Sequence, residues 1–286
     1  MPEAAAGPDA LIVTPATREQ WSVVTDWAAA EGWNPGERDT AAFFAQDPEG
    51  FLLGHLDGEP VSAVSVVNYS SDYAFLGFYL VRPDLRGRGL GMATWKAGLA
   101  HAGDRVIGLD GVPGQQRNYR RSGFEFAYGS ARFTGVPQPA PSDGSVRALE
   151  PADLPAVHAY DSACLPADRE PFLTTWLADP GNRTLVRFAG GELTGYAAVR
   201  PARDCLRVGP LFADDARSAR ELLAALAELA GGAAIALDVP LCNDSAVRLA
   251  EESGLTPSFE TARMYTGPVR DHHRERVFGA TTLELG

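Results

Sequence analysis

Residues 81–93 read VRPDLRGRGLGMA and lie between a run typical of a strand and a run typical of a helix. The three glycines of this segment can reach positive φ and let the backbone approach a ligand. Their N–H groups and the helix start behind them attract an anion. Arg86 and Arg88 add guanidinium groups that suit pyrophosphate oxygens. The segment predicts a phosphate-binding loop, with an unliganded basic surface loop as the alternative.

The spacing of the glycines narrows the choice of phosphate-containing ligands. A P-loop requires GxxxxGK[ST], but the only lysine, Lys96, follows Trp95. A dinucleotide fingerprint requires G-x-G-x-x-G, and counting from the first or second glycine of the loop puts Met92 or Thr94 where the third belongs. Asp110 does follow about 20 residues later, where that fold places its ribose-binding acid, so a dinucleotide stays open as a minor alternative.

Composition sets the class of protein. A chain of 286 residues predicts about two domains, and 45% hydrophobic with 22% charged residues exclude a disordered or fibrous protein. The 25 basic and 37 acidic groups give a net charge of −12, which argues against nucleic acid or an anionic membrane as partner and favours a cationic small molecule. The three cysteines show no CxxC pair, so we expect no metal and no disulfide. No secretory or membrane-spanning segment is visible, which predicts a cytoplasmic protein.

The chain repeats itself on either side of a proline-rich stretch, residues 135–144. Alternating prolines forbid a helix and cannot join a sheet interior, so this stretch predicts a linker. Short similar segments occur in the same order about 130 residues apart: 109–113 with 237–240, 122–124 with 253–255, and 131–135 with 262–267. We therefore predict a duplicated domain, with a first copy at 1–136, a linker at 137–144 and a second copy at 145–286.

Hydrophobic periodicity predicts an α+β architecture in both copies. The expected strands are 11–14, 51–56, 61–68, 73–81, 105–110 and a closing run through 133, then 184–189, 193–199, 205–211, 233–239 and 259–265. The expected helices are 18–30, 38–46, 90–102 and 115–122, then 153–163, 170–178, 215–230 and 244–252.

Two motifs resemble those of the GNAT N-acetyltransferases. Arg86-Gly87-Arg88-Gly89-Leu90-Gly91 is similar to their R/Q-x-x-G-x-G/A pyrophosphate loop, and the segment from Tyr119 to Phe124 is similar to their Y-x-x-x-G-F ending. The second copy and the tail at 277–286 resemble the two-module bacterial acetyltransferases of the YitH type. The resemblance implies tandem GNAT-like domains, each a mostly antiparallel mixed sheet flanked by helices.

The resemblance also implies a donor and its site. In that family the strands corresponding to 73–81 and 105–110 splay apart and hold the pantetheine arm of acetyl-CoA. The thioester would meet the backbone of Tyr79, Leu80 and Val81, where an N–H could stabilise the oxyanion as a primary amine attacks. The further residues expected to contact the coenzyme are Arg86, Gly87, Arg88, Gly89, Leu90, Gly91, Thr94 and Asn118.

Two side chains are candidates for proton transfer. Tyr119 occupies the family's general-acid position, and a tyrosine is protonated at neutral pH. Packing of an ordinary aromatic is its alternative role. Asp110 at a strand end is the candidate base, through a water relay, with substrate anchoring as its alternative.

The second copy lacks these features. Residues 211–230 contain no glycine, Asp214 and Asp215 stand at the equivalent helix start, and Ala250 replaces the tyrosine. We therefore expect one active site, in the first copy, capped by the second, where Tyr160, Asp161 and Glu170 are candidates to shape the pocket. The predicted function is acetyl-CoA-dependent N-acetylation of a small cationic amine. The alternative is a catalytically silent coenzyme A-binding, sensing or regulatory protein.

Overall fold

The computed structural model describes residues 10–138 and 143–286. In the first half its strands are β1 (Ile12–Pro15), β2 (Phe51–Leu56), β3 (Glu59–Asn68), β4 (Tyr73–Val81), β5 (Val106–Gly111) and β6 (Glu125–Gly135). In the second half they are β7 (Val146–Ala148), β8 (Arg183–Ala189), β9 (Glu192–Pro201), β10 (Leu206–Ala213), β11 (Ile235–Pro240), β12 (Thr256–Tyr265) and β13 (Val277–Gly279).

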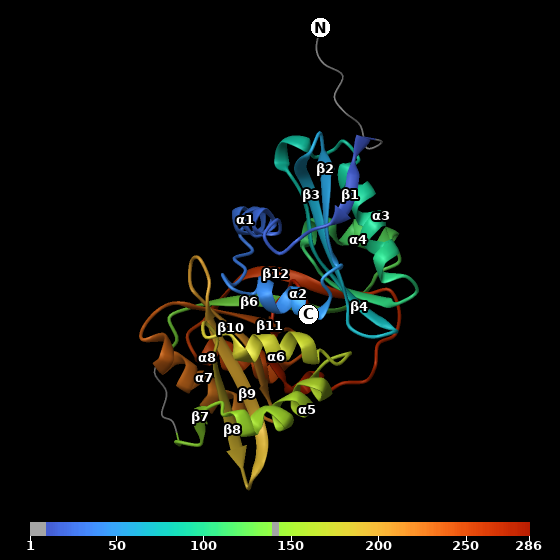
Figure 1. The fold of residues 1–286 in the computed structure, drawn as a ribbon. Coiled ribbons are helices and arrows are strands. Elements are labelled where there is room, and N and C mark those ends of the chain that lie inside the picture. Colours follow the sequence, from blue (N-terminus) through green and yellow to red (C-terminus); the bar gives the residue numbers. More distant parts are fainter. Residues whose placement is uncertain (1–9, 139–142) are drawn as a thin grey trace.

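These strands form one sheet that runs through both halves (Figure 1). Its order is β1-β2-β3-β4-β5-β12-β6-β11-β10-β9-β8-β7, and β13 pairs with β10. The pairs β4–β5 and β10–β11 are parallel, whereas the other neighbours run antiparallel. The expected mixed, mostly antiparallel sheet is therefore confirmed.

Helices flank this sheet in each half. The first half contains α1 (Ser22–Ala30), α2 (Thr40–Gln46), α3 (Leu90–Ala102) and α4 (Gln116–Arg121). The second contains α5 (Leu154–Cys164), α6 (Glu170–Ala178), α7 (Ala216–Ala230) and α8 (Asp244–Glu252). Their bounds agree with the expected helices to within a few residues, except that α1 begins four residues later than expected.

The closing strands of the two halves are exchanged in the middle of the sheet. Strand β12, from the second half, lies between β5 and β6 of the first, and β6 pairs on its other side with β11 (Figure 1). The two halves therefore share a continuous sheet rather than closing two separate ones. The boundaries at 136 and 145 stay a prediction about the chain's duplication.

The repeated sequence segments lie next to one another where the strands are exchanged. Asp110 of β5 lies opposite Arg263 of β12, and the two form a bidentate ion pair with N–O distances of 3.0 and 2.7 Å. Asp238 of β11 lies opposite Arg132 of β6 in the same way, with distances of 2.7 and 3.2 Å. Each half thus supplies an arginine that pairs with a buried aspartate of the other, and Asp238 also pairs with Arg207 of its own half.

Aromatic side chains pack the helices of the two halves together. Phe43 of α2 stacks on Phe172 of α6 with ring centroids 6.2 Å apart. The same buried cluster continues to Trp21 and Phe78 in the first half and to Tyr196 in the second. Burial of rings of this size stabilises the contact strongly. This buried cluster thus fixes the position of the two halves relative to each other.

Candidate active site

Strands β4 and β5 separate halfway along their length. Their pairing runs from Tyr73 opposite Val106 to Leu76 opposite Leu109 and stops there, although both strands continue. A cavity of about 580 Å³ opens beyond this point. The splay that the family resemblance implies is therefore present.

The backbone of β4 is irregular where it borders this cavity. The register with β3 shifts between Ala63 and Ser65, which places an extra residue in β4, and Phe78 has φ +45°. A non-glycine residue with positive φ is strained, and such bulges concentrate at functional sites. Tyr79, Leu80 and Val81 line the cavity directly after it, as expected.

The glycine loop closes one end of the cavity. Gly87 and Gly89 have φ of +78° and +81°, values that side chains rarely adopt, and Gly89 is the N-cap of α3. A Cβ on Gly91 would lie 2.6 Å from the Tyr79 Oη and 2.9 Å from the Val81 Cγ2. No side chain of the described residues caps α3, so no side-chain acceptor competes with an anion at the start of this helix.

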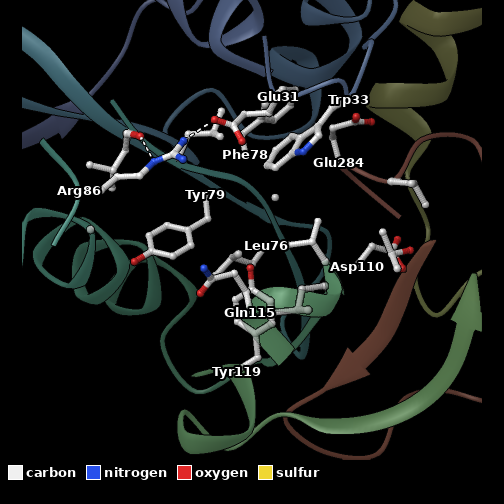
Figure 2. A pocket seen from close by; sticks show the side chains of 18 of the residues that line it. Glu31, Trp33, Leu76, Phe78, Tyr79, Arg86, Asp110, Gln115, Tyr119 and Glu284 are labelled. Atoms are coloured by element: carbon white, nitrogen blue, oxygen red, sulfur yellow. Dashed lines mark hydrogen bonds and ion pairs between the residues drawn. The ribbon is translucent and has the colours of Figure 1, made fainter. Parts of the chain in front are cut away.

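The arginines of the loop differ in their surroundings. Arg86 lines the cavity, where its Nε donates to the Val81 carbonyl at 3.0 Å and its guanidinium pairs with Glu31 (Figure 2). A phosphate would compete with Glu31 for this group. Arg88 does not line the cavity, whereas Leu90 does. Binding of coenzyme by the loop stays a prediction.

Tyr119 of α4 lines the cavity and is 7% exposed. Its ring stacks on Trp95 of α3 with centroids 5.5 Å apart. Gly111 makes room for the ring, because a Cβ at that position would lie only 2.8 Å from it. Burial raises the pKa of its hydroxyl above the ordinary value, and Tyr79 adds to this. The group therefore keeps its proton throughout the neutral range, as a general acid must.

Asp110 also lines the cavity, but both of its carboxylate oxygens accept hydrogen bonds from Arg263. Burial raises the pKa of this carboxyl, and the arginine opposes that shift. Asp238 makes the equivalent pair in the second half, so the pairing belongs to the fold of both halves. A base held in this way loses an ion pair when it is protonated. The predicted role of Asp110 as base has little geometric support.

Several other expected residues lie outside the cavity. The Thr94 side chain is fully buried, and its hydroxyl contacts Ser62 Oγ at 2.6 Å and donates to the Leu90 carbonyl at 3.1 Å, so the geometry gives its expected contact with the coenzyme no support. Asn118 is exposed on α4, and its amide donates to Gln115 at 2.8 Å. Neither lines the cavity, and the same holds for Tyr160, Asp161 and Glu170 of the second half.

The far end of the cavity is built by residues that sequence patterns did not indicate. They come from the loop after α1, from β6 and β12, and from the chain's C-terminal tail. They are Trp33, Arg132, Phe259, Thr261, Leu283 and Glu284. In Figure 2 Arg86 and Glu284 mark the two ends, with Tyr79 and Leu76 between them. No local signal could have found this set, because its members meet only through the strand exchange and the path of the tail.

The matching gap of the second half is filled by protein. Strands β10 and β11 pair only over residues 206–208, and β13 then lies beside β10. A Cβ on Gly279 of β13 would lie 2.2 Å from the Leu237 Cδ1, which shows how closely the strand fits. Asp215 caps α7 by accepting the Ser218 N–H at 2.7 Å, so it occupies a donor that an anion would need.

Within residues 10–138 and 143–286, no group of three or more His, Cys, Asp or Glu side chains is arranged to hold a metal ion. Among the helices of that same part of the chain, none is both long and apolar enough to cross a membrane.

Comparison with known proteins identifies the family. The model of the Acetyltransferase (GNAT) family matches residues 16–124, and that of an Acetyltransferase (GNAT) domain matches residues 157–279. The chain is 34% identical over 274 residues to the Holothin acyltransferase of Pseudoalteromonas sp. (strain SANK 73390), which covers 95% of this chain and 93% of the relative. The chain therefore belongs to the GNAT acetyltransferases of the two-module type and is an acyltransferase enzyme.

Solved structures agree on the fold. A Pyrococcus horikoshii protein assigned as an acetyltransferase is 22% identical and superposes with a TM-score of 0.82, over 100% of this chain and 99% of that one. A tandem GNAT protein from the clavulanic acid biosynthesis pathway is 18% identical, with a TM-score of 0.62 over 91% of this chain and 100% of that one. The paired arrangement of the two halves thus recurs in a tandem protein.

Proposed function

We propose that this enzyme is an acetyl-CoA-dependent N-acetyltransferase that acetylates a primary amine of a small molecule by direct attack. The observation that carries the proposal is the single cavity that joins the glycine loop, the bulge of β4 and Tyr119. The loop supplies outward N–H groups at a helix start for a pyrophosphate, and the splay supplies room for a pantetheine arm. A cytoplasmic location stays a prediction from the sequence.

The chemistry divides between backbone and side chain. At the bulge, residues 77–81 have no partner strand on the β5 side. A backbone N–H on that side is therefore free of sheet pairing with β5 and is suited to stabilise the oxyanion that forms from the thioester. The attacking nitrogen forms a bond to the carbonyl carbon as the C–S bond breaks. Tyr119, which keeps its proton at neutral pH, is suited to protonate the departing thiolate.

The far end of the cavity favours one kind of acceptor. Trp33, Phe259 and Leu283 offer apolar surface there, and Glu284 offers a carboxyl group. This combination suits a compact, largely apolar molecule with one amino group that is cationic in solution, which also accords with the chain's net charge of −12. A polyamine would leave further ammonium groups against apolar walls. The relative named a Holothin acyltransferase supports a small-molecule acceptor.

The test combines binding with turnover. Purified protein is titrated with coenzyme A by calorimetry and then incubated with acetyl-CoA and a panel of primary amines, with thiol release and acetylated product measured together. We expect binding and, for at least one amine, stoichiometric thiol and amide. Coenzyme binding without turnover across aliphatic amines, arylamines and amino sugars would favour the sensing protein instead. Absence of coenzyme binding would contradict both.

A further inference from the structure

Charged side chains in the cavity are few, and most of them are neutralised. Among the described residues, those lining it are Glu31, Arg86, Asp110, Arg132 and Glu284. Glu31 pairs with Arg86, Asp110 pairs with an arginine of β12, and Arg132 pairs with an aspartate of β11. Glu284 has no ion pair and accepts no hydrogen bond within the described part of the chain.

Glu284 lies beside the place where the thioester is expected. The chain leaves β13 in the second half and crosses into the first, where its tail packs against β4. A Cβ on Gly77 would lie 2.0 Å from the Glu284 carbonyl oxygen and 3.2 Å from its Cα, so only glycine admits the tail here. Gly77 directly precedes Phe78, the residue with positive φ. Glu284 is therefore within one residue of the bulge that faces the cavity.

The tail around Glu284 is held in place. The Tyr69 hydroxyl donates to the Leu285 carbonyl at 2.8 Å, and the Leu285 N–H donates to the Thr282 hydroxyl at 3.0 Å. The Arg169 guanidinium donates to the Thr281 hydroxyl at 2.7 Å. Contacts on both sides of Glu284 thus hold the tail at the cavity wall, where Figure 2 shows Glu284 among the lining side chains.

The carboxyl group itself is in an unusual state. Glu284 is 4% exposed, and its Oε2 is buried without a hydrogen-bond partner in the described structure. Burial raises the pKa of this carboxyl, while Arg207 and Arg132 moderate the shift. A buried polar atom left unpaired costs about 1–3 kcal/mol. A group kept in this state at the wall of a ligand cavity indicates a missing hydrogen-bond donor from the ligand.

We propose that Glu284 is the general base of the acetyl transfer. This inference rests on the proposed function. The acceptor enters as an ammonium ion, R–NH₃⁺, and the Glu284 carboxylate takes one of its protons, which leaves the neutral amine and a carboxylic acid. The amine lone pair then forms the C–N bond, and the C–S bond breaks. The nitrogen loses a second proton and the sulfur gains one through Tyr119, giving amide and thiol. Glu284 returns its proton to solvent between turnovers.

The test uses Glu284→Gln, which keeps the size of the side chain and removes its basicity. We expect kcat to fall about 10²- to 10⁴-fold for an aliphatic amine at neutral pH, while coenzyme affinity stays within about twofold. The loss should shrink as the pH rises and more of the amine is already neutral. An arylamine acceptor, which is uncharged at neutral pH, should lose much less. Glu275→Gln, on the same C-terminal segment but outside the cavity, is the matched control and should behave as wild type.

Each other outcome has a distinct meaning. If Glu284→Gln has the kcat of the wild type, whatever its KM, Glu284 is not the general base, and the proposed function still stands. A rate loss that is equal for arylamines and aliphatic amines and constant with pH indicates a structural effect and also overturns it. A wild-type protein that acetylates no amine overturns the proposed function, and this inference falls with it. Retained coenzyme binding in calorimetry shows that the variant is folded.

Discussion

Replacing Tyr119 by Phe removes one hydroxyl from the proposed active site and little else. The ring of Tyr119 is held by its stacking on Trp95 and by an edge-to-face contact with Phe124, whose ring centroid lies 6.4 Å away, and Phe preserves both contacts. No described residue hydrogen-bonds to the hydroxyl, so its removal leaves no buried group unpaired. We expect the free energy of unfolding to change by less than about 1 kcal/mol.

The kinetic effect should be much larger than the effect on stability. Proton transfer by a positioned side chain contributes about 10²- to 10⁴-fold to a rate. This range corresponds to about 3–5 kcal/mol on the activation barrier. In the proposed arrangement the coenzyme is bound by the loop and the backbone of β4, so its dissociation constant should stay within about twofold of wild type.

Steady-state thiol release measured against pH, with calorimetric titration of coenzyme A, checks this prediction. Tyr265→Phe is the matched control, because the Tyr265 hydroxyl is also buried without a partner among the described residues but does not line the cavity. An unchanged kcat in Tyr119→Phe would refute the role of this tyrosine as acid. An equal loss in both variants would show that the effect comes from packing.

Three further predictions concern the loop, the exchanged strands and the tail. Gly89→Glu should abolish calorimetric binding of coenzyme A, because it places a carboxylate and a residue strained by about 1–2 kcal/mol at the start of α3. Thermal unfolding should still show a folded protein, and retained affinity would contradict the placement of the pyrophosphate. Burial alone would raise the pKa of Asp238, but Arg207 and Arg132 outweigh it and hold that pKa low, so its contribution to stability is full above about pH 4 and is lost as the pH falls through the lowered value. In urea titrations Asp238→Asn should cost about 3–5 kcal/mol at neutral pH and less in acid, and a cost independent of pH would count against the ion pair. For Glu284 the sign is opposite, because burial raises its pKa and the folded wild type loses stability as the pH rises from about 4.3 through the raised pKa. The stability of Glu284→Gln relative to wild type should therefore increase over that interval, and a flat difference would argue that the carboxyl is solvated.

The glycine loop was predictable because its signal is local. Positive φ at Gly87 and Gly89, and the close approach at Gly91, are demands on the backbone that only glycine meets. The following helix and the preceding strand show their own periodicity in the sequence. The loop, its position between the two elements and the fold class could therefore be predicted without a structure.

Asp110 illustrates what local reasoning leaves out. A lone carboxylate at a strand end near a predicted cleft is typical of a base, and nothing near it in sequence reveals a partner. Its partner, Arg263, lies 153 residues away and reaches it only because β12 is exchanged into the first half. The repeated segments contain both partners, since Asp110 corresponds to Asp238 and Arg263 corresponds to Arg132. The repeat alone does not say whether the ion pairs form within one copy or between the two.

The sequence by itself determined the elements, the duplication, the family and the half of the chain that carries the loop, because each depends on spacing along one segment. Only the tertiary structure decided which closing strand pairs with which half, since β6 and β12 have nearly the same pattern and either could complete either sheet. It also decided that β13 fills the second cleft and that the tail beyond it brings Glu284 to the first. Such contacts join residues distant in sequence, and their energy depends on packing that no single segment encodes.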